Sequence, residues 1–255
     1  MSESVIFCEG YHDRAFWAGW LLHLGCVDPG LPTAGSSRRV QVVDPWNDPV
    51  IGGHFAYYSR TGRFLRVVPC GGRHLILPLA SRRLGQRGTK TLLRLAINVD
   101  ADTSAAGTAA GPTGLRKQDV LHQVQQIDSG ASLNADGNIE VDGGATVVAL
   151  IRWETHDPPA PGLPDQQTLE RLVSAALAAA YPPWAKSVQD WLDARPSPPL
   201  PDPKEHAWSY MAGWYAGHGC EDFYSNLWRD ANLVPELESR LRSSGAWQIA
   251  ETVAG

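Results

Sequence analysis

Two apolar runs of the chain each end in acidic residues, and this pattern constrains the fold more than any other feature. The run at residues 4–8 ends at Glu9. The run at residues 91–99, rich in Leu and other aliphatic residues, ends at Asp100 and, after one alanine, Asp102. Such a run is typical of a strand that is buried on both faces of a parallel sheet. Because parallel strands end at one edge of their sheet, where open α/β folds bind ligands, we expect the three acids to lie at that edge.

Helical and extended patterns alternate along the chain. Apolar residues recur every three or four positions in residues 13–24, which predicts a helix with one buried face. Further helices are expected at residues 75–86, 115–127, 168–180, 184–193 and 204–228, followed by a short polar tail. Strands are expected at residues 4–8, 40–43, 55–59, 64–68 and 91–99, with one or two more within 138–153. The alternation favours an α/β fold, a Rossmann-like sheet of mainly parallel strands flanked by helices, with a helical C-terminal extension.

A proline-rich stretch at residues 195–203 suggests a division of the chain. Prolines favour an extended, semi-rigid connector. We therefore expect an α/β domain over residues 1–194, with a β-rich insertion near 40–72. Residues 195–255 would form the connector and a helical segment that packs on this domain.

Composition narrows the class of protein. The net charge of −5 excludes the uniformly basic surface of a protein that coats nucleic acid by charge alone. The four cysteines are far apart and lack zinc-site spacing, which indicates reduced, buried thiols. The N-terminus lacks the pattern of a signal peptide, and no apolar stretch is long enough to span a membrane. We expect a soluble cytoplasmic protein with no membrane partner.

Carboxylates at a strand end can bind a hard cation. Magnesium prefers oxygen ligands in near-octahedral geometry, and Glu9, Asp100 and Asp102 supply them. If the strand continues through Asp102, both aspartate carboxylates point to one face. A turn or a helix cap is the alternative explanation for Asp-x-Asp alone. An EF-hand loop is excluded, because its sixth and twelfth positions would be Ala105 and Gly111, where Gly and Glu are required.

The same segments resemble the Toprim family. VIFCEGYHDRAFWAGWLL resembles the first Toprim motif, a strand ending in Glu-Gly before an amphipathic helix, and INVDADTS resembles the second, a strand ending in Asp-x-Asp. VVPCGGRHLILPL resembles the strand, Gly-Gly turn and helix that link these motifs in stand-alone and OLD-type Toprim proteins. The resemblance covers residues 4–104. It implies that Glu9 is a metal ligand or general acid/base and that Asp100 and Asp102 bind Mg²⁺, with Mn²⁺ as an alternative.

Three more residues enter through the same resemblance. Asp13 stands where OLD nucleases commonly have Glu, which leaves its role as a ligand open. Glu170 would add a ligand for a second ion; alternatively, it is an acid that the helix dipole favours in a first turn. Lys204 would neutralise charge on a transferred phosphate; alternatively, it is a solvated lysine.

The resemblance implies a Mg²⁺-dependent nuclease, a hydrolase that cleaves DNA or RNA, with a role in phage defence. OLD nucleases contain an ATPase, but no phosphate-binding G-x-x-x-x-G-K-[ST] motif occurs here, so a separate chain would supply it. The basic cluster at residues 81–90 is a candidate for contact with nucleic acid; a solvated helix end is the alternative. Two other functions stay open: a toxin-like effector or regulatory subunit that acts only with a partner ATPase, and a non-catalytic binding module stabilised by metal. A homo-oligomer is compatible with each.

Overall fold

The computed structural model describes residues 2–31, 40–50, 55–102, 114–158, 165–194, 209–211, 213–214 and 220–255. Contacts group the chain into two compact units. The first unit comprises Met1–Val99, Leu115–Ile151 and Gln248–Gly255, and the second comprises Asp100–Gly114 and Arg152–Trp247. These units do not coincide with the division expected at residue 194, because helix α4 (Leu169–Ala180) packs against helix α8 (Leu233–Ser243).

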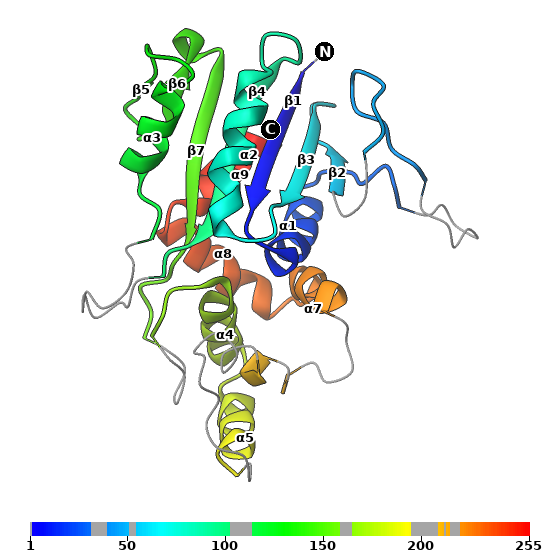
Figure 1. The fold of residues 1–255 in the computed structure, drawn as a ribbon. Helices are drawn as coiled ribbons and strands as arrows, with labels where there is room; N and C mark the ends of the chain where they lie inside the picture. The colour runs from blue at the N-terminus through cyan, green and yellow to red at the C-terminus, as the bar shows by residue number, and fades with distance from the viewer. Residues whose placement is uncertain are drawn as a thin grey trace. The chain divides into compact units, whose positions relative to one another are not determined.

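A mixed sheet forms the centre of the first unit (Figure 1). Its strands are β1 (Glu3–Cys8), β2 (Phe55–Tyr58), β3 (Phe64–Pro69), β4 (Leu92–Asp100), β5 (Ser132–Leu133), β6 (Ile139–Val141) and β7 (Thr146–Trp153), in the order β2-β3-β1-β4-β7-β6-β5. Strand β1 pairs in parallel with β3 and β4, and the β2–β3 and β5–β6–β7 pairs are antiparallel. The expected α/β class is therefore confirmed, with parallel strands in the middle and antiparallel pairs toward both edges.

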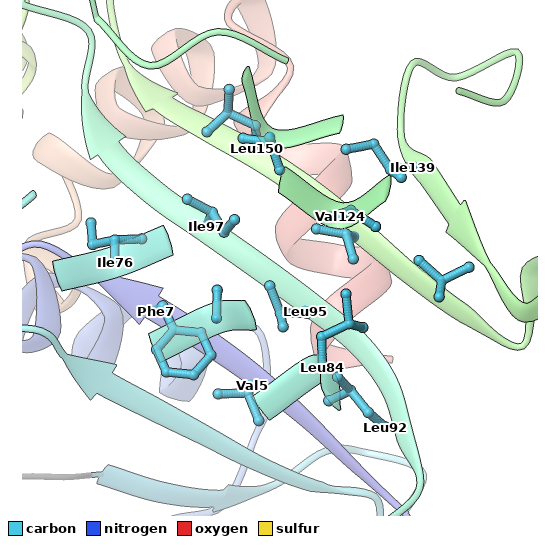
Figure 2. Packing of buried hydrophobic residues seen from close by; sticks show 14 of the residues in the cluster. Val5, Phe7, Ile76, Leu84, Leu92, Leu95, Ile97, Val124, Ile139 and Leu150 are labelled. Atoms are coloured by element: carbon cyan, nitrogen blue, oxygen red, sulfur yellow. The ribbon is translucent and has the colours of Figure 1, made fainter. Parts of the chain in front are cut away.

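Helices α2 (Arg73–Gly85) and α3 (Lys117–Gln125) cover one face of this sheet. Side chains alternate along a strand, so β1 directs Val5 and Phe7 into this layer (Figure 2). Strand β4 contributes Leu95 and Ile97 in the same way, against Leu84 of α2. The apolar run that predicted a buried strand is thus explained by burial on both faces.

The opposite face of β4 meets helix α1 (Tyr11–His23). Here the Trp17 indole nitrogen donates to the Asn98 side-chain oxygen at 2.8 Å, which satisfies two buried polar groups. Trp17 also stacks on Trp20, with ring centroids 4.5 Å apart, and both rings are fully buried. The aromatic stripe of this helix is therefore core, as its spacing predicted.

The second unit is mainly helical. It contains α4, α5 (Pro182–Asp193), α7 (Cys220–Asn226), α8 and the beginning of α9 (Ala246–Ala254). The prediction of a short polar tail was wrong, because α8 and α9 are helices with buried apolar faces. In α8, Leu233, Leu237 and Leu241 follow one another at helical spacing, and all three are fully buried.

The remaining sequence predictions concern residues 40–43 and the stretches that are rich in glycine or proline. Residues 40–43 form no strand, since this stretch contributes only an isolated bridge from Val43 to Pro49. The glycine-rich stretch at 103–113 and the proline-rich stretch at 195–203 lie outside the described residues.

Candidate functional site

The turn after β1 carries the first candidate ligand. Glu9 follows Cys8, and Gly10 is the N-cap residue of α1. The Gly10 amide donates to Asp13 Oδ2 at 2.9 Å, so this buried carboxylate caps the first turn of the helix. Asp13 therefore has a structural role, and its additional role as a metal ligand stays a prediction.

The Gly-Gly turn between β3 and α2 lies against the turn after β1. The Cys70 amide donates to the Cys8 carbonyl at 2.8 Å, and the Gly72 amide donates to the Glu9 carbonyl at 2.9 Å. Gly71 and Gly72 have φ values of 78° and 130°, which residues with a side chain rarely adopt. This turn thus brings the start of α2 beside the backbone of Glu9.

Two buried thiols next to these turns, those of Cys8 and Cys70, have raised pKa values. Burial raises the pKa of Cys8, and the negative charges of Asp13 and Glu9 raise it further. Burial and the same two carboxylates raise the pKa of Cys70 to about 12. Both pKa shifts come mainly from burial, and the negative charges of Asp13 and Glu9 make smaller contributions.

Hydrogen bonds with the start of helix α4 and with the residues just before it hold the Asp-x-Asp segment in place. Asp100 is the last residue of β4, and its Oδ1 accepts a hydrogen bond of 2.9 Å from the Leu169 amide, at the start of α4. The Asp102 amide donates to the Gln167 carbonyl at 3.0 Å, and Gln166 Nε2 donates to Asp102 Oδ1 at 3.1 Å. Three hydrogen bonds therefore tie the two aspartates to one short segment.

The backbone of Asp102 is left-handed, with a φ of 54°. The condition that the strand continues through Asp102 was therefore wrong, because β4 ends at Asp100. The alternation of side chains along a strand therefore does not set the direction of the Asp102 carboxylate. The hydrogen bonds with the Gln166 side chain and the Gln167 carbonyl set it instead. A left-handed backbone is uncommon for residues with a side chain, and aspartate tolerates it better than most.

Gly114 packs directly on this segment. A Cβ atom at this position would lie 2.1 Å from the Ala101 carbonyl oxygen, far inside van der Waals contact. Only glycine permits this approach, so Gly114 helps to set the path of the chain through Asp100 and Asp102.

Glu170 occupies the first turn of α4, and its side chain is 1% exposed. The Tyr224 hydroxyl approaches Glu170 Oε1 at 3.5 Å, the outer limit of a hydrogen bond. Its predicted role as a ligand of a second ion stays a prediction. Lys204 lies outside the described residues.

The donor set of Glu9, Asp100 and Asp102 fits magnesium, because all of its side-chain donors are carboxylate oxygens. Within the described ranges, no three side chains of His, Cys, Asp or Glu are placed so that they could hold a metal ion together.

The basic cluster at residues 81–90 is largely engaged in ion pairs. The pairs are Arg83 Nε with Glu3 at 2.6 Å, Arg87 Nε with Asp142 at 2.6 Å, and Lys90 Nζ with Asp44 at 3.1 Å. These cations have structural partners on neighbouring elements. The cluster therefore offers less free positive charge to a phosphate backbone than its sequence suggested.

Three further residues of this region were not predicted from the sequence: Gln166, Gln167 and Gly114. The two glutamines precede the N-cap residue Thr168, which the sequence does mark as a helix start, but nothing in their own pattern points to Asp102. Gly114 is one of several glycines in a glycine-rich stretch. Its contact depends on a fold that local sequence does not reveal.

Comparisons with known proteins support the fold alone. No protein-family model matches the chain. No curated protein matches it either. Among solved structures, it is similar to the crystal structure of a hypothetical protein from Pyrococcus horikoshii, with a TM-score of 0.65, 16% identity and full coverage of both chains. At that identity the likeness concerns architecture. In the part of the chain that the structure describes, no helix is long and apolar enough to cross a membrane.

Proposed function

We propose that this protein is a Mg²⁺-dependent nuclease of the cytoplasm, in which Glu9, Asp100 and Asp102 bind the cation. Mn²⁺ is the expected substitute, and DNA or RNA is the expected substrate. The Toprim-like motifs that suggested this activity remain a resemblance.

One observation carries the proposal: the Asp-x-Asp segment lies at the carboxyl end of a central strand, and hydrogen bonds from the segment that begins α4 hold both of its carboxylates. Strand β4 pairs in parallel with β1, with Cys8 opposite Asn98, so both strands run toward the same edge of the sheet. Ligands of open α/β folds bind at this edge.

The residues of the chain have distinct roles in this proposal. Asp100 and Asp102 hold the cation, and the contact of Asp100 with the first amide of α4 fixes its carboxylate. Glu9 is a further ligand or the general base that takes a proton from the attacking water. A bound divalent cation polarises a phosphodiester and lowers the pKa of a coordinated water. Lys204 remains a predicted source of positive charge toward the phosphate.

The test is digestion of DNA and RNA substrates with Mg²⁺ or Mn²⁺ by the full chain and by Asp100→Asn and Asp102→Asn. Each substitution should lower the cleavage rate by more than about 100-fold, since even outer-shell partners of a metal contribute 10–100-fold. Asp119→Asn is the matched control, because Asp119 is a surface aspartate in the first turn of α3, paired with Arg116. Its rate should equal that of the wild type.

Cleavage that survives both aspartate substitutions would refute the proposal. Mg²⁺ binding without cleavage of either nucleic acid would favour the non-catalytic binding module. Cleavage that appears only after addition of a copurifying ATPase would favour the regulatory subunit.

A further inference from the structure

The contact between Gln166 and Asp102 suggests a role that neither residue's sequence context indicates. Gln166 Nε2 donates to Asp102 Oδ1 at 3.1 Å, and the adjacent Gln167 carbonyl accepts from the Asp102 amide at 3.0 Å. The same short segment therefore contacts both the side chain and the backbone of Asp102. It fixes the φ and the carboxylate orientation of this residue together.

The chemical nature of the donor matters. A lysine or an arginine in the place of Gln166 would neutralise the carboxylate and compete with a cation for it. The neutral amide of Gln166 orients Asp102 and adds no positive charge beside it. Carboxylates that bind metals are commonly held in this way by outer hydrogen bonds, which fix their direction and tune the affinity for the ion.

The surroundings of Gln166 are rigid enough for such a role. Gln166 is half-buried, and Gln167 and Thr168 after it are buried. The Thr168 side chain accepts from the Arg171 amide at 3.2 Å and so caps α4. The position of Gln166 is therefore tied to the start of a buried helix.

We propose that Gln166 is a positioning residue that sets the preference of Asp102 for Mg²⁺ over Ca²⁺. This inference rests on the proposed metal site. Mg²⁺ demands near-ideal octahedral geometry, whereas Ca²⁺ accepts six to eight oxygen ligands in flexible arrangements. Loss of the bond from Gln166 lets the Asp102 carboxylate rotate. Such freedom weakens the binding of Mg²⁺ more than that of Ca²⁺.

The test is calorimetric titration of the full chain with Mg²⁺ alone and with Ca²⁺ alone. Gln166→Met keeps the length of the side chain and removes the amide donor. Its affinity for Mg²⁺ should fall by about 10–100-fold, as for other outer-shell partners, and its affinity for Ca²⁺ should fall much less. Gln189→Met is the matched control, because Gln189 is also half-buried and its Nε2 donates to an aspartate, Asp193, at 2.7 Å. It should leave both affinities unchanged.

The outcomes separate this inference from the proposed function. Unchanged Mg²⁺ binding in Gln166→Met, or an equal loss for both ions, overturns the positioning role and leaves the metal site standing. A wild-type chain that binds neither ion, or an Asp102→Asn variant that binds Mg²⁺ as tightly as the wild type, overturns both. Circular dichroism verifies that each variant is folded. If Gln166→Met is not, Gln166→Asn, which keeps an amide but shortens its reach, gives the same comparison.

Discussion

At the scale of single residues, the segment from Asp100 to Asp102 carries two candidate metal ligands, and one of them has a left-handed backbone. Asp is among the few residue types that tolerate a left-handed backbone, because its short side chain can bond locally. Here the Asp102 carboxylate instead accepts from Gln166, across a gap of many residues in the sequence. The conformation thus depends on tertiary contacts, and single substitutions beside it should be informative.

Replacing Gly114 with alanine tests whether close packing shapes this segment. The new Cβ would lie 2.1 Å from the Ala101 carbonyl oxygen, so the backbone must move. Such overpacking costs about 1–3 kcal/mol of the free energy of unfolding, which chemical denaturation would measure. Gly88→Ala is the control, because no atom lies within 4 Å of a Cβ there. Equal stability of the two variants would contradict the expectation.

At the scale of elements, the amino ends of the central strands are tied together by a buried charge cluster. Glu3 opens β1 and is fully buried. Its Oε1 accepts from Arg66 of β3 at 2.7 Å and from Arg83 of α2 at 2.6 Å. One carboxylate therefore links two strands and a helix.

Glu3→Ala should destabilise the protein strongly, because it leaves the partly or fully buried cations Arg66 and Arg83 without their counter-charge. The loss of one partner from a buried ion pair costs about 3–5 kcal/mol. Asp190→Ala removes the exposed pair with Lys186 on α5 and should cost at most about 1 kcal/mol. Thermal and denaturant unfolding would compare them. A small loss for Glu3→Ala would mean that water compensates the two arginines.

Sequence predicted elements better than it predicted the contacts between them. The strand before Glu9, the strand before Asp100 and the helix after Thr168 were all expected, because their apolar periodicity and end signals are local. The partners of Asp102 were not expected, because Gln166 meets it only through the fold. Helix α8 was missed although its leucines recur at helical spacing, because charged residues between them made the segment resemble a polar tail.

At the scale of the whole molecule, the ends of the chain belong to one unit. Gln248–Gly255, which ends α9, groups with Met1–Val99 rather than with the segment that precedes it. Val253 and Ala254 are buried there. The first unit is therefore assembled from segments that are far apart in the sequence.

Deletion of residues 248–255 should destabilise the protein even though it removes no candidate ligand. Burial of a valine such as Val253 alone contributes about 1.5–3 kcal/mol, so the melting temperature should fall clearly. The double substitution Gln248→Ala and Glu251→Ala changes only exposed side chains of the same helix and should leave stability nearly unchanged. A deletion variant as stable as the full chain would show that this helix end is dispensable.

The charge cluster around Glu3 sits at the amino ends of the parallel strands, whereas Glu9 follows β1 at its other end. On the proposed function, the stabilising ion pairs and the metal ligand Glu9 lie at opposite ends of β1. The stability of the protein could therefore be increased by substitutions around Arg66 and Arg83 without a change near Glu9. Conversely, the residues near Glu9 could be redesigned without loss of the ion pairs that Glu3 makes.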